Sequence, residues 1–516
     1  MKIYHTGNYM HNLLKVFIVV GLLGLPSFQA AAAEQDNSKK EEPAKVPEAQ
    51  SSVTKHSGKF NGVTVKYTVT AGDTHLKNDK GEAVASIYSI AYTRDGVNDP
   101  ASRPVTFLFN GGPGSASLWL HMGVFGPKRV DVPSDATNAG AAPYDVVANP
   151  LSLLDVTDLV FIDPVGTGYS RVIGKGEGKD FWGLNEDAKS VARFIQIYVT
   201  NNKRWNSPKY VGGESYGTTR TAALVKELQQ GYNSMALNGL ILISSILDFQ
   251  TTDSGSANDD PYISFLPTFA ATAWYHGKVD KTGRTLESFV EEARNFAANE
   301  YSVALLKGSR MSAAERQDVT KKLSLYTGLS ETYLKHARLR VNEFRFMKEL
   351  LRDQGKVVGR LDGRFTGTEE DDAGETFEAD PSGYGISAAY TAAVNDYFAR
   401  TLKVEREDRY EVLSHKPGSK WNWKQGKSWT GGYPALGHYV ARGMRQNKDL
   451  RVYVANGYYD MATPFFGTEY TMAQYGIDPK RVTMDYFEAG HMMYIHHPSL
   501  EKLAKNVRQF ILDGSK

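Results

Sequence analysis

Short apolar runs, some alternating with polar residues and some continuous, fill the first third of the chain. Residues 62–69 and 85–91 alternate apolar with polar positions, which predicts two strands that each bury one face. Asp-Lys-Gly at 79–81 predicts the turn between them. Residues 105–109 and 158–162 are apolar throughout, a pattern typical of strands buried on both faces.

Strands and helices alternate in the next segment. A helix beginning near Asn185, its predicted N-cap, carries apolar residues on one face at 188, 191, 195 and 198. Residues 209–211 are predicted to end a strand, 218–230 to form a helix, and 240–244 to form another strand. This alternation predicts the α/β class, with a mostly parallel central sheet flanked by helices.

The pattern becomes mainly helical between residue 254 and about residue 445. Helices are predicted near 286–306 and from Ser312 and Ser330 onwards. We interpret this region as an insertion that caps the sheet and shapes the substrate pocket. The sheet then resumes with strands at 450–455 and 482–487, and an amphipathic helix at 499–512 closes the chain.

An acidic, glycine-rich loop between Gly359 and Gly383 lies inside the insertion. It contains four consecutive carboxylates at 369–372, a composition that is compatible with calcium binding. Their spacing matches no EF-hand loop, so we expect a solvated acidic loop instead.

The amino-terminal segment has the layout of a secretory signal peptide. Lys2 and Lys15 precede a ten-residue apolar run at 16–25, and small residues suitable for cleavage follow Pro26. The run is too short to span a bilayer comfortably, although an uncleaved anchor helix is the alternative. We therefore predict a periplasmic or secreted protein without stable membrane association after signal cleavage.

The expected organisation follows from these patterns. Residues 34–57 are rich in Lys, Glu, Gln, Ser and Pro and are predicted to be a disordered linker. The predicted parts of the chain are the signal peptide at 1–33, the linker at 34–57, the first part of an α/β core at 58–253, the cap at 254–445 and the second part of the core at 446–516.

Composition narrows the function classes. The 60 basic and 58 acidic residues give a net charge of +2, which offers no support for a nucleic-acid partner. The chain has no cysteine, which excludes a thiol nucleophile, a cysteine-based zinc site and an iron–sulfur cluster. An exported protein of 516 residues without disulfides is more typical of a bacterial envelope than of a eukaryotic secretory pathway. No metal and no cofactor are expected.

The segment Gly213-Glu-Ser-Tyr-Gly217 stands between a predicted strand and a predicted helix. That context is typical of a nucleophile elbow, in which two glycines permit a tight turn that exposes a serine hydroxyl. Ser215 is therefore the candidate nucleophile. Without the strand and helix, a motif of this length would often occur by accident in a glycine-rich chain.

A glycine-rich loop, Asn110-Gly-Gly-Pro-Gly114, follows the predicted strand 105–109. One alternative is a phosphate-binding loop, but the Lys-Ser/Thr ending of a P-loop is missing and the dinucleotide fingerprint does not fit. In a chain with a nucleophile elbow, the loop is better suited to an oxyanion hole.

A serine nucleophile needs a base and a carboxylate to orient that base. Asp460 lies just past the strand 450–455, and His491 lies just past the strand 482–487. This is the order Ser, Asp, His of α/β hydrolases. The competing residues are mid-strand, capping or surface positions: His496, His497, Asp485 and Asp478.

Five ordered motifs resemble the serine carboxypeptidase family over most of the chain after the linker. They are Asn110-Gly-Gly-Pro-Gly114, Asp163-Pro-Val-Gly-Thr-Gly-Tyr-Ser170, Gly213-Glu-Ser-Tyr-Gly217, Gly457-x-x-Asp460 and Gly490-His-Met492. The resemblance implies an α/β-hydrolase fold and release of C-terminal residues from peptides through an acyl-enzyme.

The resemblance also implies residue roles. Ser215 would be the nucleophile, His491 the general base and then acid, and Asp460 the residue that orients it. The backbone N–H groups of Gly112 and Tyr216 would form the oxyanion hole. Asn110 and Glu214 would bind the terminal carboxylate of the peptide substrate.

A glutamate can hold a carboxylate only if one of the two is protonated, which accounts for the family's preference for acidic conditions. The family usually has a second carboxylate-binding glutamate two residues before a Gly-Pro pair, and this position is Val124 here. The family's cysteine in the glycine loop is replaced by Ser115. The first departure weakens the expected recognition of the terminal carboxylate.

Two alternatives to a carboxypeptidase stay open. Val124 makes an esterase or acyltransferase on the same scaffold credible, because less of the site would be devoted to a free carboxylate. A binding protein with a relic triad is the other alternative, which the intact Ser215, Asp460 and His491 argue against.

Overall fold

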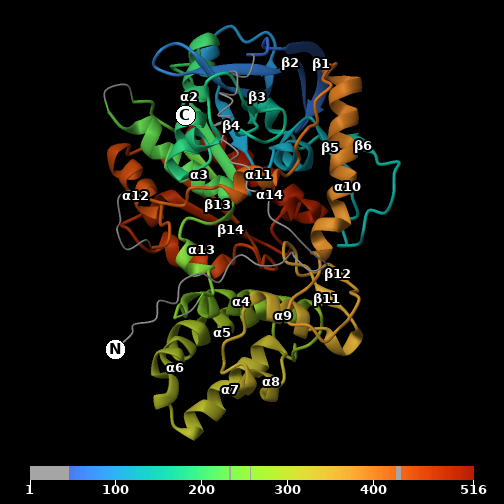
Figure 1. The fold of residues 1–516 in the computed structure, drawn as a ribbon, viewed down its shortest axis with the longest axis vertical. Coiled ribbons are helices and arrows are strands. Elements are labelled where there is room, and N and C mark those ends of the chain that lie inside the picture. The colour runs from blue at the N-terminus through green and yellow to red at the C-terminus, as the bar shows by residue number, and fades with distance from the viewer. Residues whose placement is uncertain (1–45, 232–233, 256, 426–431, 516) are drawn as a thin grey trace, which may run out of the picture. The chain divides into compact units, whose positions relative to one another are not determined.

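A computed structural model describes residues 46–231, 234–255, 257–425 and 432–515 (Figure 1). The predicted signal peptide at 1–33, and the predicted linker as far as residue 45, lie outside the described residues. Among the described helices, none is both long enough and apolar enough to cross a membrane.

A ten-stranded mixed sheet forms the centre of the fold. Its strands are β1 (Ser51–Phe60), β2 (Val63–Lys77), β3 (Ala83–Arg94), β4 (Val105–Phe109), β7 (Asp158–Ile162), β8 (Arg171–Val172), β9 (Lys209–Ser215), β10 (Gly239–Ser245), β13 (Arg451–Gly457) and β14 (Val482–Phe487). Their order is β1-β2-β3-β7-β4-β9-β10-β13-β14, with β8 paired to β3. Along this order, the strands β7-β4-β9-β10-β13-β14 pair in parallel, whereas β1, β2 and β3 pair antiparallel. The predicted mostly parallel sheet is therefore confirmed.

The first strand corrects the predicted linker. Residues 51–57, which were expected to be disordered, form most of β1, and β1 pairs along its whole length with β2. The composition of this segment is polar because β1 is an edge strand whose side chains are mostly exposed or half-buried. The polar composition therefore hid a strand.

Helices cover both faces of the sheet. On β7, Val160 and Ile162 pack into one apolar cluster, while Leu159 and Phe161 pack into the other, as the alternating geometry of a strand requires. The helices that pack into the first cluster are α2 (Leu184–Asn201), α3 (Tyr216–Gln229) and α12 (Gly437–Gln446). Those that pack into the second are α10 (Pro381–Asp396) and α14 (His497–Gly514).

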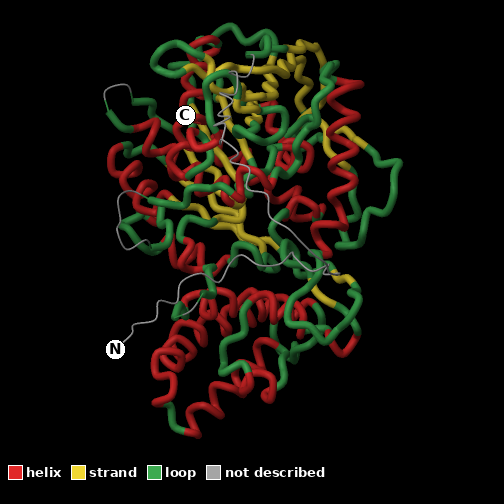
Figure 2. Tube along the Cα trace, in the orientation of Figure 1, coloured by secondary structure: helices red, strands yellow, loops and turns green. Residues whose placement is uncertain are grey.

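The helical part of the insertion has a hydrophobic core of its own. Its helices, red in the lower half of Figure 2, are α4 (Asp260–Tyr275), α5 (Leu286–Phe296), α6 (Ser302–Lys307), α7 (Ala313–Thr327), α8 (Glu331–His336) and α9 (Glu343–Glu349). Phe269 of α4 stacks on Phe346 of α9 with ring centroids 4.0 Å apart. Ser312 and Ser330 are the N-caps of α7 and α8, so the predicted helix starts are confirmed.

Two predicted boundaries need correction. The range 254–445 contains α10 and most of α12, but both helices pack against the sheet rather than inside the helical lobe. Asn185 was expected to cap α2, but it is the second residue of the helix and Gly183 is the N-cap. Both differences arise from tertiary packing, since the apolar spacing of a helix does not reveal which partner it covers.

The remaining strands and α-helices are short. They are the strand pairs β5 (Lys128–Val130) with β6 (Val146–Ala148) and β11 (Val357–Val358) with β12 (Thr366–Gly367), and the helices α1 (Leu118–Leu120), α11 (His415–Ser419) and α13 (Phe465–Met472).

The acidic loop of the insertion is only partly solvated. Glu370, Asp371 and Asp372 are exposed as expected, but the Glu369 side chain is 4% exposed and forms an ion pair with Lys348 of α9. Glu369 thus anchors the loop to the helical lobe. No cluster of three or more potential metal ligands occurs among the described residues.

Asp158, at the start of β7, is the shared partner of two buried arginines. Its carboxylate accepts from Arg103 Nε at 2.7 Å and from Arg204 Nη1 at 2.5 Å. A third bond, from the Arg94 N–H, ties it to β3. This network connects β3, β7 and the loop before β9 at the buried end of the sheet.

We expect Asp158→Asn to lower the free energy of unfolding by about 3–5 kcal/mol, because it leaves two buried guanidinium groups without a counter-charge. Urea unfolding measures the effect. Asp131→Asn is the matched control. The Asp131 side chain is 46% exposed, so its ion pair with Arg129 should contribute less than about 1 kcal/mol. Equal losses in the two variants would contradict the proposed importance of the buried network.

Candidate active site

The turn from β9 to α3 has the geometry of a nucleophile elbow. Ser215 ends β9 with φ 61° and ψ −132°, a strained conformation for a residue that has a side chain. A Cβ on Gly213 would lie 2.3 Å from the Gly217 carbonyl oxygen, and one on Gly217 would lie 2.9 Å from the Phe109 oxygen. The two glycines are therefore required by close backbone packing.

The glycine-rich loop after β4 lies directly against this elbow. A Cβ on Gly111 would lie 2.5 Å from the Tyr216 backbone nitrogen. Gly112 has φ 101°, a left-handed conformation that favours glycine. The structure thus brings the two residues of the predicted oxyanion hole, Gly112 and Tyr216, to the wall of one cavity of about 690 Å³ that Ser215 also lines.

Asp460 and His491 are joined by a hydrogen bond of 2.8 Å between His491 Nδ1 and Asp460 Oδ2. Asp460 is fully buried and also accepts from the Ala462 N–H and from the N–H and hydroxyl of Thr463. These bonds fix the carboxylate. Its bond to Nδ1 leaves Nε2 as the ring nitrogen of His491 that can accept a proton.

The interaction between Asp460 and His491 shifts the pKa values of both side chains. Burial opposes the charged form of His491, but the charge and hydrogen bond of Asp460 outweigh it and raise the pKa of His491. Burial likewise acts to raise the pKa of Asp460, yet the charge of His491 and the bonds from His491 and Thr463 hold that pKa below its ordinary value. The arrangement therefore favours a carboxylate beside an imidazole that protonates readily.

The backbone of His491 is held from two sides. Its N–H donates to the Leu361 carbonyl, and its carbonyl accepts from the Ser244 hydroxyl at 2.6 Å. His491 and Ser215 line the same cavity, although no hydrogen bond joins their side chains among the described residues. Such bonds between a nucleophile and its base are often formed only in the complex with substrate.

Asn110 and Glu214 are both buried and line the cavity beside Ser215. Asn110 is fixed at two points: its side-chain Oδ1 accepts from the Leu120 N–H at 3.0 Å, and its carbonyl accepts from Arg220 at 2.7 Å. Because Oδ1 is already engaged with Leu120, the amide Nδ2 remains as the hydrogen-bond donor that Asn110 offers to a ligand.

Burial raises the pKa of Glu214 to about 7, against the opposing effects of His491 and of a hydrogen bond from Tyr494. The hydroxyl of Tyr494 donates to Glu214 Oε2 at 2.7 Å. Glu214 therefore changes its protonation state near neutral pH.

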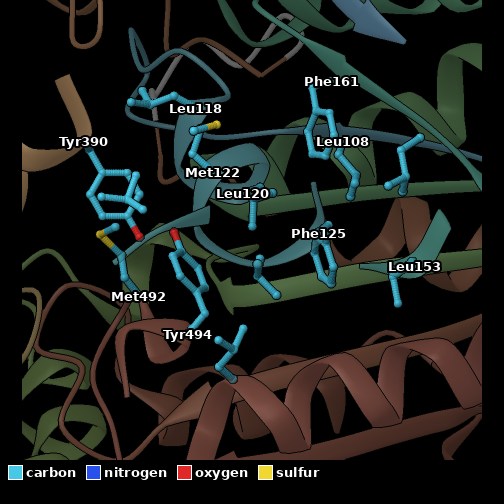
Figure 3. Packing of buried hydrophobic residues seen from close by; sticks show 14 of the residues in the cluster. Leu108, Leu118, Leu120, Met122, Phe125, Leu153, Phe161, Tyr390, Met492 and Tyr494 are labelled. Atoms are coloured by element: carbon cyan, nitrogen blue, oxygen red, sulfur yellow. The ribbon is translucent and has the colours of Figure 1, made fainter. Parts of the chain in front are cut away.

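Tyr494 is a site residue that the sequence analysis missed. It lies three positions after His491, and in Figure 3 its hydroxyl points toward that of Tyr390 from α10. A Cβ on Gly123 would lie 2.5 Å from the Tyr494 ring, so this glycine makes room for the tyrosine. No short motif signals the contact, because it joins segments 280 residues apart.

Val124 lies in the core and does not line the cavity. It is fully buried in the cluster that contains Phe125 and Met122, and its carbonyl accepts from Asn149. The position expected for a second carboxylate-binding glutamate thus holds an apolar core residue, whereas Tyr494 donates a hydrogen bond to Glu214.

The competing candidates have structural contacts. His496 caps α14 and bonds Ser499, and the N–H of His497 donates to Ser134. Asp485 accepts from Tyr453 and Asn506, and Asp478 caps a short 3-10 helix. None of these four residues lines the cavity.

The insertion contributes a wall of the site, as the sequence analysis predicted, although the sequence did not identify the residues that form it. Arg360 and Leu361 line the cavity, the carbonyl of Leu361 accepts from the N–H of His491, and that of Arg360 accepts from the N–H of Met461. The segment thus contacts both loops that carry Asp460 and His491.

Comparison with known proteins supports a common scaffold. The chain is 30% identical over 168 residues to serine carboxypeptidase-like 13 of Arabidopsis thaliana. This alignment covers 32% of this chain and 36% of that protein. It is 33% identical over 112 residues to the pheromone-processing carboxypeptidase KEX1 of Saccharomyces cerevisiae. This alignment covers 21% of this chain and 14% of the relative. The aligned stretches therefore span about a third or less of these curated relatives.

The fold agrees over a longer range. The crystal structure of a prohormone-processing carboxypeptidase from Saccharomyces cerevisiae, Kex1(delta)p, superposes with a TM-score of 0.54 at 16% identity and covers 87% of this chain and 91% of that one. This likeness confirms the predicted α/β-hydrolase fold. The model of the family described as serine carboxypeptidase matches residues 86–492, which includes every predicted site residue. This chain belongs to the serine carboxypeptidase family.

Proposed function

We propose that this protein is a serine carboxypeptidase that releases C-terminal residues from peptides through an acyl-enzyme. The observation that carries the proposal is the arrangement around one cavity of a strained serine, a histidine bonded to a buried aspartate, and a buried glutamate with a pKa of about 7. The first three groups suit acyl transfer, and the fourth suits a substrate that carries a carboxylate.

In the proposed reaction, Ser215 Oγ attacks the carbonyl carbon of the last peptide bond while His491 Nε2 accepts its proton. Asp460 holds the other ring nitrogen, Nδ1, in its protonated form and stabilises the imidazolium. The N–H groups of Gly112 and Tyr216 donate to the developing oxyanion. His491 then protonates the leaving amine, and a water molecule repeats the sequence to release the acyl group from Ser215.

The proposed selectivity for free C-termini comes from Asn110 and Glu214. With Oδ1 of Asn110 engaged by Leu120, its Nδ2 donates to one oxygen of the terminal carboxylate. A protonated Glu214 donates to the other oxygen, and its pKa of about 7 keeps it protonated through the weakly acidic range. An ionised Glu214 would repel the substrate instead.

An esterase or acyltransferase is the second candidate function. The observation that favours it is Val124, which is buried in the core and leaves the site without the second glutamate. Such an enzyme would use the same triad but would not require a free carboxylate next to the scissile bond.

Incubation with a peptide that has a free C-terminus should remove residues one at a time, whereas the C-terminal amide should be cleaved at least about tenfold more slowly because it lacks the charge that the site binds. Mass spectrometry of the products measures both rates, and Ser215→Ala should abolish both. Inert peptides alongside fluorophosphonate labelling of Ser215 would reject the exopeptidase proposal. Rapid turnover of p-nitrophenyl esters would then favour the second candidate.

We expect a bell-shaped pH dependence of kcat/KM for a peptide acid. His491 must be neutral to accept a proton, and its pKa is raised by Asp460 despite burial, so activity falls on the acidic side. Glu214 loses its proton as the pH rises through about 7, so activity also falls on the alkaline side. An ester substrate without a terminal carboxylate should keep only the acidic limb.

Two variants separate these limbs. Glu214→Gln should remove the alkaline limb for the peptide acid and leave the acidic limb in place. Tyr494→Phe should move the alkaline limb upward by about one pH unit, because the lost hydrogen bond stabilises the ionised carboxylate. An alkaline limb that survives unchanged in Glu214→Gln would assign it to another group.

We also propose that the protein is exported to the periplasm or secreted, on the basis of the signal-like sequence of residues 1–33. Mass spectrometry of the protein recovered from cells should find its N-terminus near residue 34. Recovery with Met1 intact would contradict cleavage.

A further inference from the structure

Arg360 is a cation in the cavity wall that the proposed mechanism does not use. It belongs to the insertion and lines the cavity together with Ser215 and His491. Its N–H donates to Asp380 at 2.9 Å and its carbonyl accepts from Met461 at 3.0 Å, one residue from Asp460. The backbone of Arg360 is therefore fixed relative to the triad.

The guanidinium group of Arg360 makes no hydrogen bond or ion pair with the residues that the structure describes, and its Nε atom is buried without an acceptor. Arg360 as a whole is half-buried. Three buried arginines are paired instead: Arg103 with Asp158, Arg220 with Asp187, and Arg364 with Asp362. Since buried polar donors are normally paired, the unpaired Nε of Arg360 in the cavity wall is available to a ligand.

The carboxylates near Arg360 form no ion pair with its guanidinium group in the part of the chain that the structure describes. Asp380 accepts from the N–H groups of Arg360 and Leu361 and from Ser382. Glu343, at the start of α9, also lines the cavity, but its Oε2 atom is buried without a partner and no ion pair joins it to Arg360. Burial raises the pKa of Glu343 and Arg360 acts against that rise, which indicates that the two side chains share one region of the cavity.

Arg360 also lies close enough to His491 for its charge to matter. It acts to lower the pKa of His491, in the same direction as burial and against the effect of Asp460. An anion at Arg360 would offset this positive charge and favour the imidazolium that forms when His491 accepts a proton.

We propose that Arg360 binds a carboxylate of the substrate, either the C-terminal carboxylate or that of an aspartate or glutamate side chain next to the scissile bond. The planar guanidinium offers paired donors that match the two oxygens of a carboxylate. The insertion therefore supplies charge selectivity to a site whose reacting groups come from the sheet. This inference rests on the proposed function.

The test compares N-blocked peptides with free C-termini that carry Glu or Gln before the scissile bond, and a p-nitrophenyl ester without a carboxylate. In Arg360→Gln, kcat/KM for the peptide whose carboxylate Arg360 binds should fall roughly ten- to a hundredfold. The ester, assayed at a pH above the acidic limb where His491 is neutral in both proteins, should be hydrolysed at an unchanged rate. A loss confined to the Glu peptide assigns the side-chain carboxylate. An equal loss for both peptides assigns the terminal carboxylate.

Three further variants sharpen the comparison. Arg360→Lys should recover part of the preference, because the charge remains but the paired donors are lost. Glu343→Gln should strengthen the preference for the carboxylate-bearing substrate, because a neighbouring acid is removed. Arg345→Gln is the matched control: it removes one positive charge from α9, where Arg345 pairs with the exposed Glu375, and it should leave all three rates unchanged. Equal losses for peptides and ester in Arg360→Gln would overturn the proposal.

A binding measurement keeps this inference separate from peptidase activity. N-acetyl-glutamate should protect Ser215 from fluorophosphonate labelling in the wild-type protein at lower concentration than the C-terminal amide of N-acetyl-glutamine does. Arg360→Gln should reduce the difference, and the part that remains is the contribution of Asn110 and Glu214. If peptides are inert but this protection is seen and is weakened in Arg360→Gln, the proposed function fails and the role of Arg360 stands. Equal protection by the two compounds in the wild type would overturn the role of Arg360.

Discussion

The site is built on the contact of two backbones without side chains between them. The Asn110–Gly112 loop lies against the elbow so closely that a methyl group at Gly111 would collide with the Tyr216 nitrogen. Gly213 and Gly217 are similarly closed against each other and against Phe109. These approaches bring Ser215 and the N–H groups of Gly112 and Tyr216 to one cavity wall, so the chemistry of the site depends first on sterics.

Polar contacts then fix the groups that this packing brings together. Asp460 is held by three protein donors besides His491, and the backbone of His491 is held by Leu361 on one side and Ser244 on the other. Leu361 belongs to the insertion, whereas Ser244 belongs to the sheet. The position of the proposed base therefore depends on both parts of the fold, and the insertion does more than cover the cavity.

The electrostatics of the cavity centre on Glu214. In this chain the Tyr494 hydroxyl donates a hydrogen bond to the Glu214 carboxyl, while Val124 is a core residue. A tyrosine hydroxyl can donate to the carboxylate without adding a negative charge, so it lowers the pKa of Glu214, whereas a second carboxylate would raise it. Burial raises the pKa of Glu214, and the charge of His491 together with the hydrogen bond from Tyr494 limits that pKa to about 7.

The sequence by itself determined the elements and the order of the reactive groups. Apolar alternation located the sheet strands, the glycine spacing located the elbow, and strand ends located Asp460 and His491, because each of these signals is local or follows chain order. Tertiary structure alone decided the contacts between distant segments. Tyr494 meets Glu214 across 280 residues, Arg360 of the insertion lines the same cavity as Ser215 and His491, and β1 forms from a polar segment because β2 offers it an edge. No local pattern encodes such contacts, since they depend on which surfaces the folded chain brings together.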